Sequence, residues 1–138
     1  MKKTIKKERF YQYPIDQVWQ ALTDPQALST WFMKADFKPE VGYQFTFQDK
    51  PQGKWDGILK GEVLLVEQPN QLSYTWKGDQ MKHETQVKWQ LIPHNEGTLL
   101  RLEHAGFQGF GDVVIGFFHQ LGWPKHFKQL DNFLEHNR

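Results

Sequence analysis

The last third of the chain constrains the fold most, because a strand-like run there is followed by an unusually aromatic helix-like stretch. The run ends at His104-Ala105-Gly106-Phe107, and the stretch that follows carries phenylalanines, a tryptophan and leucines at helical spacing. A helix with so much aromatic surface has to bury it against something equally apolar. We therefore expect a long C-terminal helix that packs across a sheet.

This helical stretch begins near Gly111 and carries two apolar stripes that are rotated relative to each other. The first consists of Phe110, Val114, Phe117 and Leu121, and the second of Trp123, Phe127, Leu130 and Leu134. The rotation falls at Gly122-Trp123-Pro124, where proline removes a backbone donor and clashes with the preceding turn. The sequence predicts one kinked helix or two abutting helices, with the first stripe covering a cavity and the second sealing the core.

Upstream of this helix, most of the apolar residues alternate as they do in strands. Residues 4–13 predict a strand, and two short helices follow, with Thr23-Asp24-Pro25 ending the first and capping the second. Further strands are predicted at residues 43–47, 57–67, 72–76, 87–91 and 98–104, each with one apolar and one polar face. The predicted fold class is α+β, with a curved antiparallel sheet around the C-terminal helix.

Length and composition narrow the functional classes. A chain of 138 residues is expected to form one domain, residues 1–138. Its 17 Lys and Arg nearly balance 16 Asp and Glu, which makes nucleic acid an unexpected partner. The absence of cysteine excludes disulfides, thiolate metal sites and cysteine nucleophiles. No apolar run approaches the roughly 20 residues of a membrane span, and no signal-peptide segment is visible, so a cytoplasmic protein is expected.

The strand alternation places a largely aromatic set of side chains on the inner face of the sheet, opposite the helix. The candidate ligand-binding residues are Tyr43, Phe45, Phe47, Tyr74, Trp76, Trp89, Leu102 and His104 from the sheet, and Phe117 and Leu121 from the helix. An apolar pocket with a few polar tips is typical of a small-molecule site. A solid aromatic core would account for the same rings. His104 could likewise bond a ligand or be a structural residue bonded to the backbone or to Trp123.

The sequence offers no catalytic or metal-binding motif. His119 and His126 are seven residues apart across Pro124 and are expected to be surface residues, as is the carboxylate of Asp112. No serine lies in a nucleophile elbow, and the glycines at residues 106–111 fit no nucleotide fingerprint. We expect no cofactor, no metal and no catalytic residue, and we interpret residues 106–111 as a flexible lid.

Five segments stand in an order that resembles one known family. They are Val18-Trp19-Gln20-Ala21-Leu22-Thr23-Asp24-Pro25 through Trp31-Phe32, Gly42-Tyr43-Gln44-Phe45, Leu72-Ser73-Tyr74-Thr75-Trp76, Gly97-Thr98 leading to His104-Ala105-Gly106-Phe107, and Gly122-Trp123. This order is similar to that of the bacterial relatives of the Hsp90 ATPase activator domain, in the START-like (SRPBCC, Bet v 1-like) helix-grip superfamily. The resemblance implies a bent sheet gripping the C-terminal helix, a cavity that takes a hydrophobic small molecule, and an association with stress responses.

Three functions from different classes follow. The first and favoured one is binding of a hydrophobic or aromatic small molecule between sheet and helix. The second is a cyclase-like or aromatase-like enzyme that uses the same cavity, with His104 as its acid or base. The third is a chaperone-associated protein that binds its partner through an exposed patch, for which Trp31-Phe32 and the loop at residues 50–55 are candidates.

Overall fold

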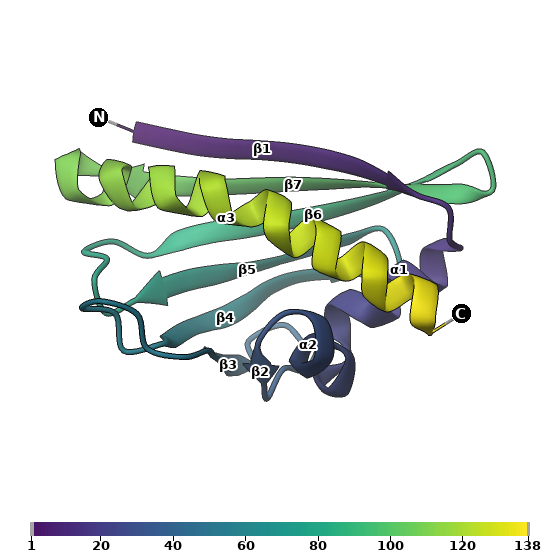
Figure 1. Cartoon of the computed structure of the whole chain (residues 1–138), viewed down its shortest axis with the longest axis horizontal. Helices are drawn as coiled ribbons and strands as arrows, with labels where there is room; N and C mark the ends of the chain where they lie inside the picture. Colours follow the sequence, from purple (N-terminus) through teal and green to yellow (C-terminus); the bar gives the residue numbers. More distant parts are fainter. Residues whose placement is uncertain (1, 138) are drawn as a thin grey trace.

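The computed structural model describes residues 2–137, except for the side chains of residues 2, 110, 113, 114, 117 and 121. Its strands and helices follow the predicted order (Figure 1). The elements are β1 (Lys2–Tyr11), α1 (Ile15–Thr23), α2 (Pro25–Trp31), β2 (Lys34–Ala35), β3 (Gln44–Gln48), β4 (Ile58–Glu67), β5 (Gln71–Gly78), β6 (Thr85–His94), β7 (Gly97–Gln108) and α3 (Gly109–His136). The α+β class and the positions of the main strands are confirmed, whereas the two-residue β2 was not predicted.

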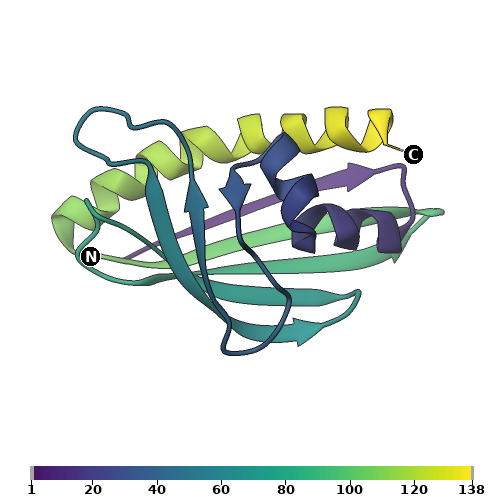
Figure 2. The same ribbon diagram turned by 90° about the horizontal axis from the view of Figure 1, so that it is seen from below.

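All strands belong to one antiparallel sheet in the order β1-β7-β6-β5-β4-β3-β2. The first strand thus pairs with the last one, and the rest form a meander. Register shifts interrupt the pairing between Lys3 and Ile5 in β1 and between Val63 and Leu65 in β4. Such irregularities bend and twist a strand. Figure 2 shows the resulting sheet curving beneath α3, which lies along its concave side.

The two short helices close one end of this layer. Asp24 caps α2, since its Oδ2 accepts a hydrogen bond of 2.9 Å from the backbone N–H of Ala27, and Pro25 follows at the first helical position. The sequence predicted this cap correctly. The indole of Trp31 reaches back from α2 and donates to the carbonyl of Ala21 in α1 at 2.8 Å, which fastens the two helices together.

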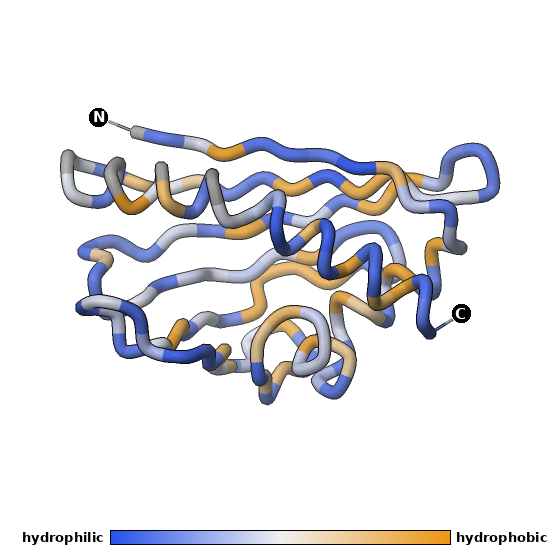
Figure 3. The backbone as a smooth tube through the Cα atoms, viewed as in Figure 1, coloured by the Kyte–Doolittle hydropathy of each residue, from blue (hydrophilic) through white to orange (hydrophobic). Residues whose placement is uncertain are grey.

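Helix α3 is a single element of 28 residues with Pro124 inside it. The segment is therefore one helix and not two abutting helices. The second stripe is buried as predicted, because Trp123, Phe127, Leu130 and Leu134 are 0–5% exposed. The side chains of the first stripe, at residues 110, 114, 117 and 121, lie outside the described residues. The hydropathy colouring in Figure 3 shows apolar and polar residues alternating along the strands beneath the helix.

The segment expected to be a flexible lid belongs to regular structure. Strand β7 continues through Gly106 to Gln108, and α3 begins at Gly109. The lid interpretation was wrong because β1 extends far enough to pair with this stretch, with Lys3 opposite Phe107. Within residues 2–137, no helix combines the length and the apolar character needed to cross a membrane.

Candidate functional site

The inner face of the sheet is covered by buried side chains, most of them aromatic, which form a wall opposite α3. Seven of the predicted site residues lie on it and are 0–3% exposed: Phe45 and Phe47 on β3, Tyr74 and Trp76 on β5, Trp89 on β6, and Leu102 and His104 on β7. Tyr43 precedes β3 and is only partly buried, with the ammonium of Lys38 over its ring at 5.7 Å from the centroid. Phe117 and Leu121 have side chains outside the described residues. The strands thus bring seven of the ten predicted residues together.

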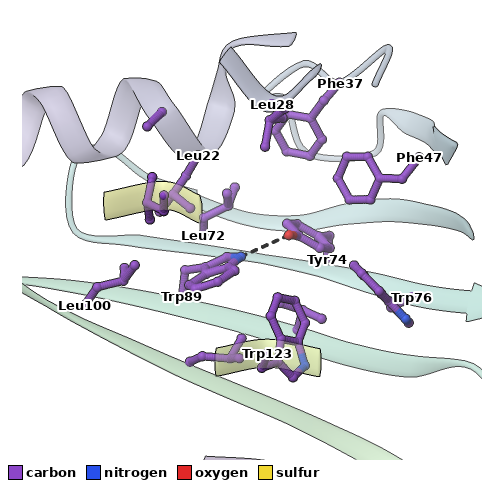
Figure 4. Close-up of a cluster of buried hydrophobic side chains, with 14 of the residues drawn as sticks. Leu22, Leu28, Phe37, Phe47, Leu72, Tyr74, Trp76, Trp89, Leu100 and Trp123 are labelled. Atoms are coloured by element: carbon purple, nitrogen blue, oxygen red, sulfur yellow. Dashed lines mark hydrogen bonds between the residues drawn. The ribbon is translucent and has the colours of Figure 1, made fainter. Parts of the chain in front are cut away.

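The rings of this wall contact one another in a continuous cluster. At one end Tyr74 packs against Phe45 and Phe47, with ring centroids 5.1 and 6.0 Å apart. The rings of Phe47 and Trp76 pack with centroids 5.9 Å apart, and those of Trp76 and Trp123 on α3 with centroids 5.6 Å apart. Figure 4 shows Tyr74, Trp76, Trp89 and Trp123 gathered over the strands of the sheet. We call this set of rings, together with His104 and His119, the inner cluster.

The position of Gly61 makes room for one of these rings. Gly61 on β4 lies opposite Phe45 in the sheet register, and a Cβ there would come within 2.5 Å of Phe45 Cζ and would also clash with the carbonyl of Thr75. Any larger residue would have to push this ring or the neighbouring strand away. The glycine therefore lets the Phe45 ring lie across β4.

His104 is held by hydrogen bonds on both ring nitrogens. Trp123 Nε1 donates to His104 Nδ1 at 3.3 Å, and Thr85 Oγ1, which itself donates to the carbonyl of Trp76, lies 2.8 Å from His104 Nε2. Since the threonine hydrogen is already used, His104 must donate from Nε2 and accept at Nδ1, which is the neutral form. Burial, together with nearby His119, holds the pKa of His104 well below its usual value. The predicted structural bond to Trp123 is confirmed.

His119 and His126 are not surface residues, contrary to expectation. Trp76 Nε1 donates to His119 Nε2 at 3.1 Å, and His119 Nδ1 lies 3.0 Å from the carbonyl of Ile115, so this imidazole too is neutral and bonded on both sides. His126 packs edge-on against Phe32, with ring centroids 4.7 Å apart. Burial lowers the pKa of both histidines. The helix stays continuous through Pro124, which keeps both residues on the side of α3 that faces the protein.

Asp112 was also expected on the surface, but its carboxylate is buried. It accepts hydrogen bonds from the backbone N–H groups of Lys82 and His83 at 3.0 and 3.2 Å, and its Oδ2 lies 2.8 Å from His83 Nδ1. Burial alone would raise the pKa of Asp112, but the bonds from Lys82 and His83 outweigh it and hold that pKa below its usual value. Asp112 thus fastens the first turn of α3 to the turn between β5 and β6.

That turn is also tied to the loop between β3 and β4. Gln80 Nε2 donates to the carbonyl of Lys54 at 3.1 Å, and the loop itself is tied to the start of β4 because Trp55 Nε1 donates to the carbonyl of Ile58 at 3.2 Å. Figures 1 and 2 show both segments near the beginning of α3, at the end of the sheet away from α1 and α2. These three segments lie together at one end of the sheet.

Two surface depressions are defined by described residues, and neither lies over the inner cluster. One, of about 440 Å³, lies on the outer face of β1, β7 and β6 between charged side chains such as Lys6, Lys88 and Glu103. The other, of about 350 Å³, lies between α1, α2 and the end of α3 and is lined largely by amides and Phe133. Within residues 2–137, and leaving aside the undescribed side chains, no three His, Asp or Glu residues gather as metal ligands would.

Sequence reasoning missed several members of the site. Phe32, Phe107 and Thr85 complete the contacts of the inner cluster, with Phe32 stacked 6.0 Å from Trp123 and Phe107 4.6 Å from His104. Phe107 continues the alternation of β7 after a break at Gly106, which has a positive φ of 102°. His119 lies one helical turn before Trp123, and this spacing could have predicted that both residues lie on the same side of the helix.

Comparison with known proteins identifies the family of this molecule. The model of the Activator of Hsp90 ATPase homolog 1-like protein family matches residues 12–135. The chain belongs to this family. No protein with curated annotation matches the sequence.

Solved structures share the fold of this chain along its whole length. MLL2253 from Mesorhizobium loti is 34% identical, with a TM-score of 0.85 and 99% of each chain covered. BH1534 from Bacillus halodurans is 28% identical, with a TM-score of 0.78 and 96% of each chain covered. DynU16, from the dynemicin biosynthetic locus, is 25% identical with a TM-score of 0.81, and the match covers 98% of this chain and 48% of DynU16. The helix-grip fold of the START-like superfamily is thereby confirmed.

Proposed function

We propose that this member of the family binds an uncharged hydrophobic or aromatic small molecule between the inner cluster and α3. The main support for the proposal is that the inner cluster is apolar and uncharged. Its rings form a continuous apolar surface, and the imidazoles of His104 and His119 are neutral and bonded to indole, hydroxyl or carbonyl groups. A charged guest would find no described counter-ion there, whereas an apolar one would gain roughly 25 cal/mol for each Å² of apolar surface buried.

The first half of α3 is the side from which a guest could enter. Gly111 and Gly122 have no atom within 4 Å of the place where a Cβ would lie, and Phe118 between them is 69% exposed. Glycines weaken a helix by roughly 0.5–1 kcal/mol each relative to alanine. The second half is anchored by side chains that are 0–5% exposed. Entry beside the first half would leave this anchored second half in place and would require the bonds of Asp112 and His119 to open.

The alternative functions have less support from the structure. Partner binding through Trp31-Phe32 requires an exposed patch, but Trp31 is only 5% exposed and is bonded to Ala21. An acid or base role for His104 requires a free ring nitrogen, and both are engaged. DynU16 comes from a biosynthetic locus, which fits a fold that handles small molecules.

Titration with N-phenyl-1-naphthylamine, an uncharged probe that fluoresces in apolar surroundings, tests the proposal. We expect saturable binding, with shifts in the methyl NMR signals of Leu72, Leu100 and Leu102, which are 0–2% exposed on the inner face. The methyl signals of Val41 and Leu64, which are 68% and 39% exposed, are internal controls and should stay in place. Absence of binding, or shifts confined to Val41 and Leu64, would refute the proposal. Native mass spectrometry of protein taken directly from cells would then identify a retained natural ligand.

A further inference from the structure

The hydrogen bonds of the inner cluster leave one donor unused. Each described indole and imidazole N–H of the cluster has an acceptor: Trp76 donates to His119, Trp123 to His104, and Trp89 to the hydroxyl of Tyr74. Tyr74 accepts that bond, at 2.9 Å, but among the described residues its own hydroxyl hydrogen has no acceptor. Figure 4 shows this bond as the dashed line between Trp89 and Tyr74.

The surroundings of Tyr74 make an unused donor there unusual. The residue is 3% exposed, and its ring packs against Phe37, Phe45 and Phe47 at centroid distances of 5.7, 5.1 and 6.0 Å. None of these side chains carries an oxygen or nitrogen that could accept the hydrogen. The Tyr74 oxygen is paired with Trp89, but its hydrogen has no acceptor among the described residues, so the hydroxyl keeps a donor that a ligand or a water molecule can use.

Charge is disfavoured at this position. Burial raises the pKa of Tyr74, so the phenol keeps its hydrogen throughout the physiological pH range and remains a donor. The same burial would penalise an anion placed beside it, because no cationic side chain is among its described contacts. The acceptor that suits this hydroxyl is therefore a neutral oxygen.

We infer that the Tyr74 hydroxyl donates a hydrogen bond to a neutral oxygen, such as a ketone or other carbonyl, of the molecule bound in the inner cluster. The inference rests on the proposed function and narrows its ligand to uncharged, largely apolar or aromatic compounds that carry a carbonyl-type acceptor. Tyr74 would fix the orientation of the ligand, since it supplies a single directional contact in surroundings that otherwise act only through shape and apolar area.

A matched pair of probes tests this inference. In 2-acetylnaphthalene a carbonyl oxygen occupies the place that a CH₂ group occupies in 2-isopropenylnaphthalene, so the two differ mainly in the acceptor. We expect Tyr74→Phe to weaken binding of the ketone by about five- to tenfold and to leave binding of the hydrocarbon unchanged, as the loss of one hydrogen bond predicts. Tyr13→Phe, which removes a phenol hydroxyl from a partly buried ring outside the inner cluster, is the control and should affect neither probe.

A second measurement does not depend on how well Tyr74→Phe folds. The carbonyl stretch of the ketone bound to the unaltered protein should move to lower infrared frequency than in a hydrocarbon solvent, since a donated hydrogen bond weakens the C=O bond. An unshifted stretch, or equal losses for both probes in Tyr74→Phe, would overturn the inference while leaving the proposed function in place. If neither probe bound, the proposed function and the inference would fail together.

Discussion

At the scale of single residues, one buried and two partly buried histidines make the stability of the protein depend on pH. Burial lowers the pKa values of His104, His119 and His126 in the folded protein. In the unfolded chain a histidine titrates near pH 6.5, so acid protonates the unfolded state first. We expect the free energy of unfolding to be constant above about pH 7.5 and to fall below pH 6.5, by at most about 1.4 kcal/mol per pH unit for each such histidine. Urea unfolding at pH 8, 6 and 5 measures this.

The variant His119→Gln separates the histidine effect from other titrations. A glutamine oxygen can still accept the bond from Trp76 Nε1, which is 3.1 Å in the present structure. The slope of stability against pH should become shallower between pH 6 and 5, because one of the titrating groups is gone. Asp112, whose pKa is also lowered, loses its contribution only at more acidic pH, as its carboxylate takes up a proton. An unchanged slope in His119→Gln would contradict the assignment.

The alternation of the strands correctly predicted which sheet residues are buried. The burial of residues on α3 was not predicted. The bond between His104 and Trp123 was anticipated because β7 alternation placed His104 on the inner face. His119 was assigned to the surface because Pro124 was expected to interrupt α3, and Asp112 because carboxylates on helices are usually exposed. Because the helix is continuous, Trp123, His119 and Asp112 lie on the same side of α3, the side that faces the protein.

At the scale of secondary-structure elements, Asp112 joins the start of α3 to the turn between β5 and β6. Asp112→Asn should destabilise the protein by about 1–3 kcal/mol, because an amide nitrogen would face donors that now meet an oxygen. The amides of Lys82 and His83 should exchange hydrogen faster, which hydrogen-exchange NMR measures directly. Asp131→Asn on the same helix is the matched control. It breaks a pair with Arg9 whose side chains are 44% and 41% exposed, so its cost should stay below about 1 kcal/mol.

Two glycines in different elements should respond oppositely to alanine. Gly122→Ala adds a methyl group to open space in α3 and should raise the stability by about 0.5–1 kcal/mol. Gly61→Ala places its methyl group against the Phe45 ring and should lower the stability by more than 1 kcal/mol. Thermal unfolding of both variants checks the signs. A destabilised Gly122→Ala would show that this part of α3 is tightly packed after all.

Element boundaries were harder to predict than the elements. Strong alternation located β3, β5 and β6, since a half-buried strand has a period of two. The ends of β7 and β1 were misplaced because strand length depends on the partner, and Lys3 pairs with Phe107 across a distance in sequence that local patterns do not encode. Strand β2 has two residues and pairs only with the end of β3. A strand this short does not show a recognisable alternation in the sequence.

At the scale of the whole molecule, the sequence predicted the layers but not the space between them. The order of periodic segments, together with the family resemblance, was enough to predict a sheet gripping a C-terminal helix, and the fold confirms it. Whether rings on a concave sheet leave a cavity depends on how Trp76, Trp123 and their neighbours interlock. That packing is decided by side-chain rotamers and by contacts between distant segments, which a single sequence does not display.

We expect the two stripes of α3 to have different roles. The first stripe should contribute to ligand binding and the second to stability. Leu130 is 0% exposed, and Leu130→Ala should cost about 2–5 kcal/mol of stability while leaving the affinity of the folded protein for N-phenyl-1-naphthylamine unchanged. Phe117→Ala, in the stripe that the sequence assigns to the cavity, should change that affinity. Phe118→Ala is the control, because a side chain that is 69% exposed should alter neither quantity. Urea unfolding and probe titration of the three variants measure both quantities, and the division fails if Leu130→Ala changes the affinity and Phe117→Ala does not.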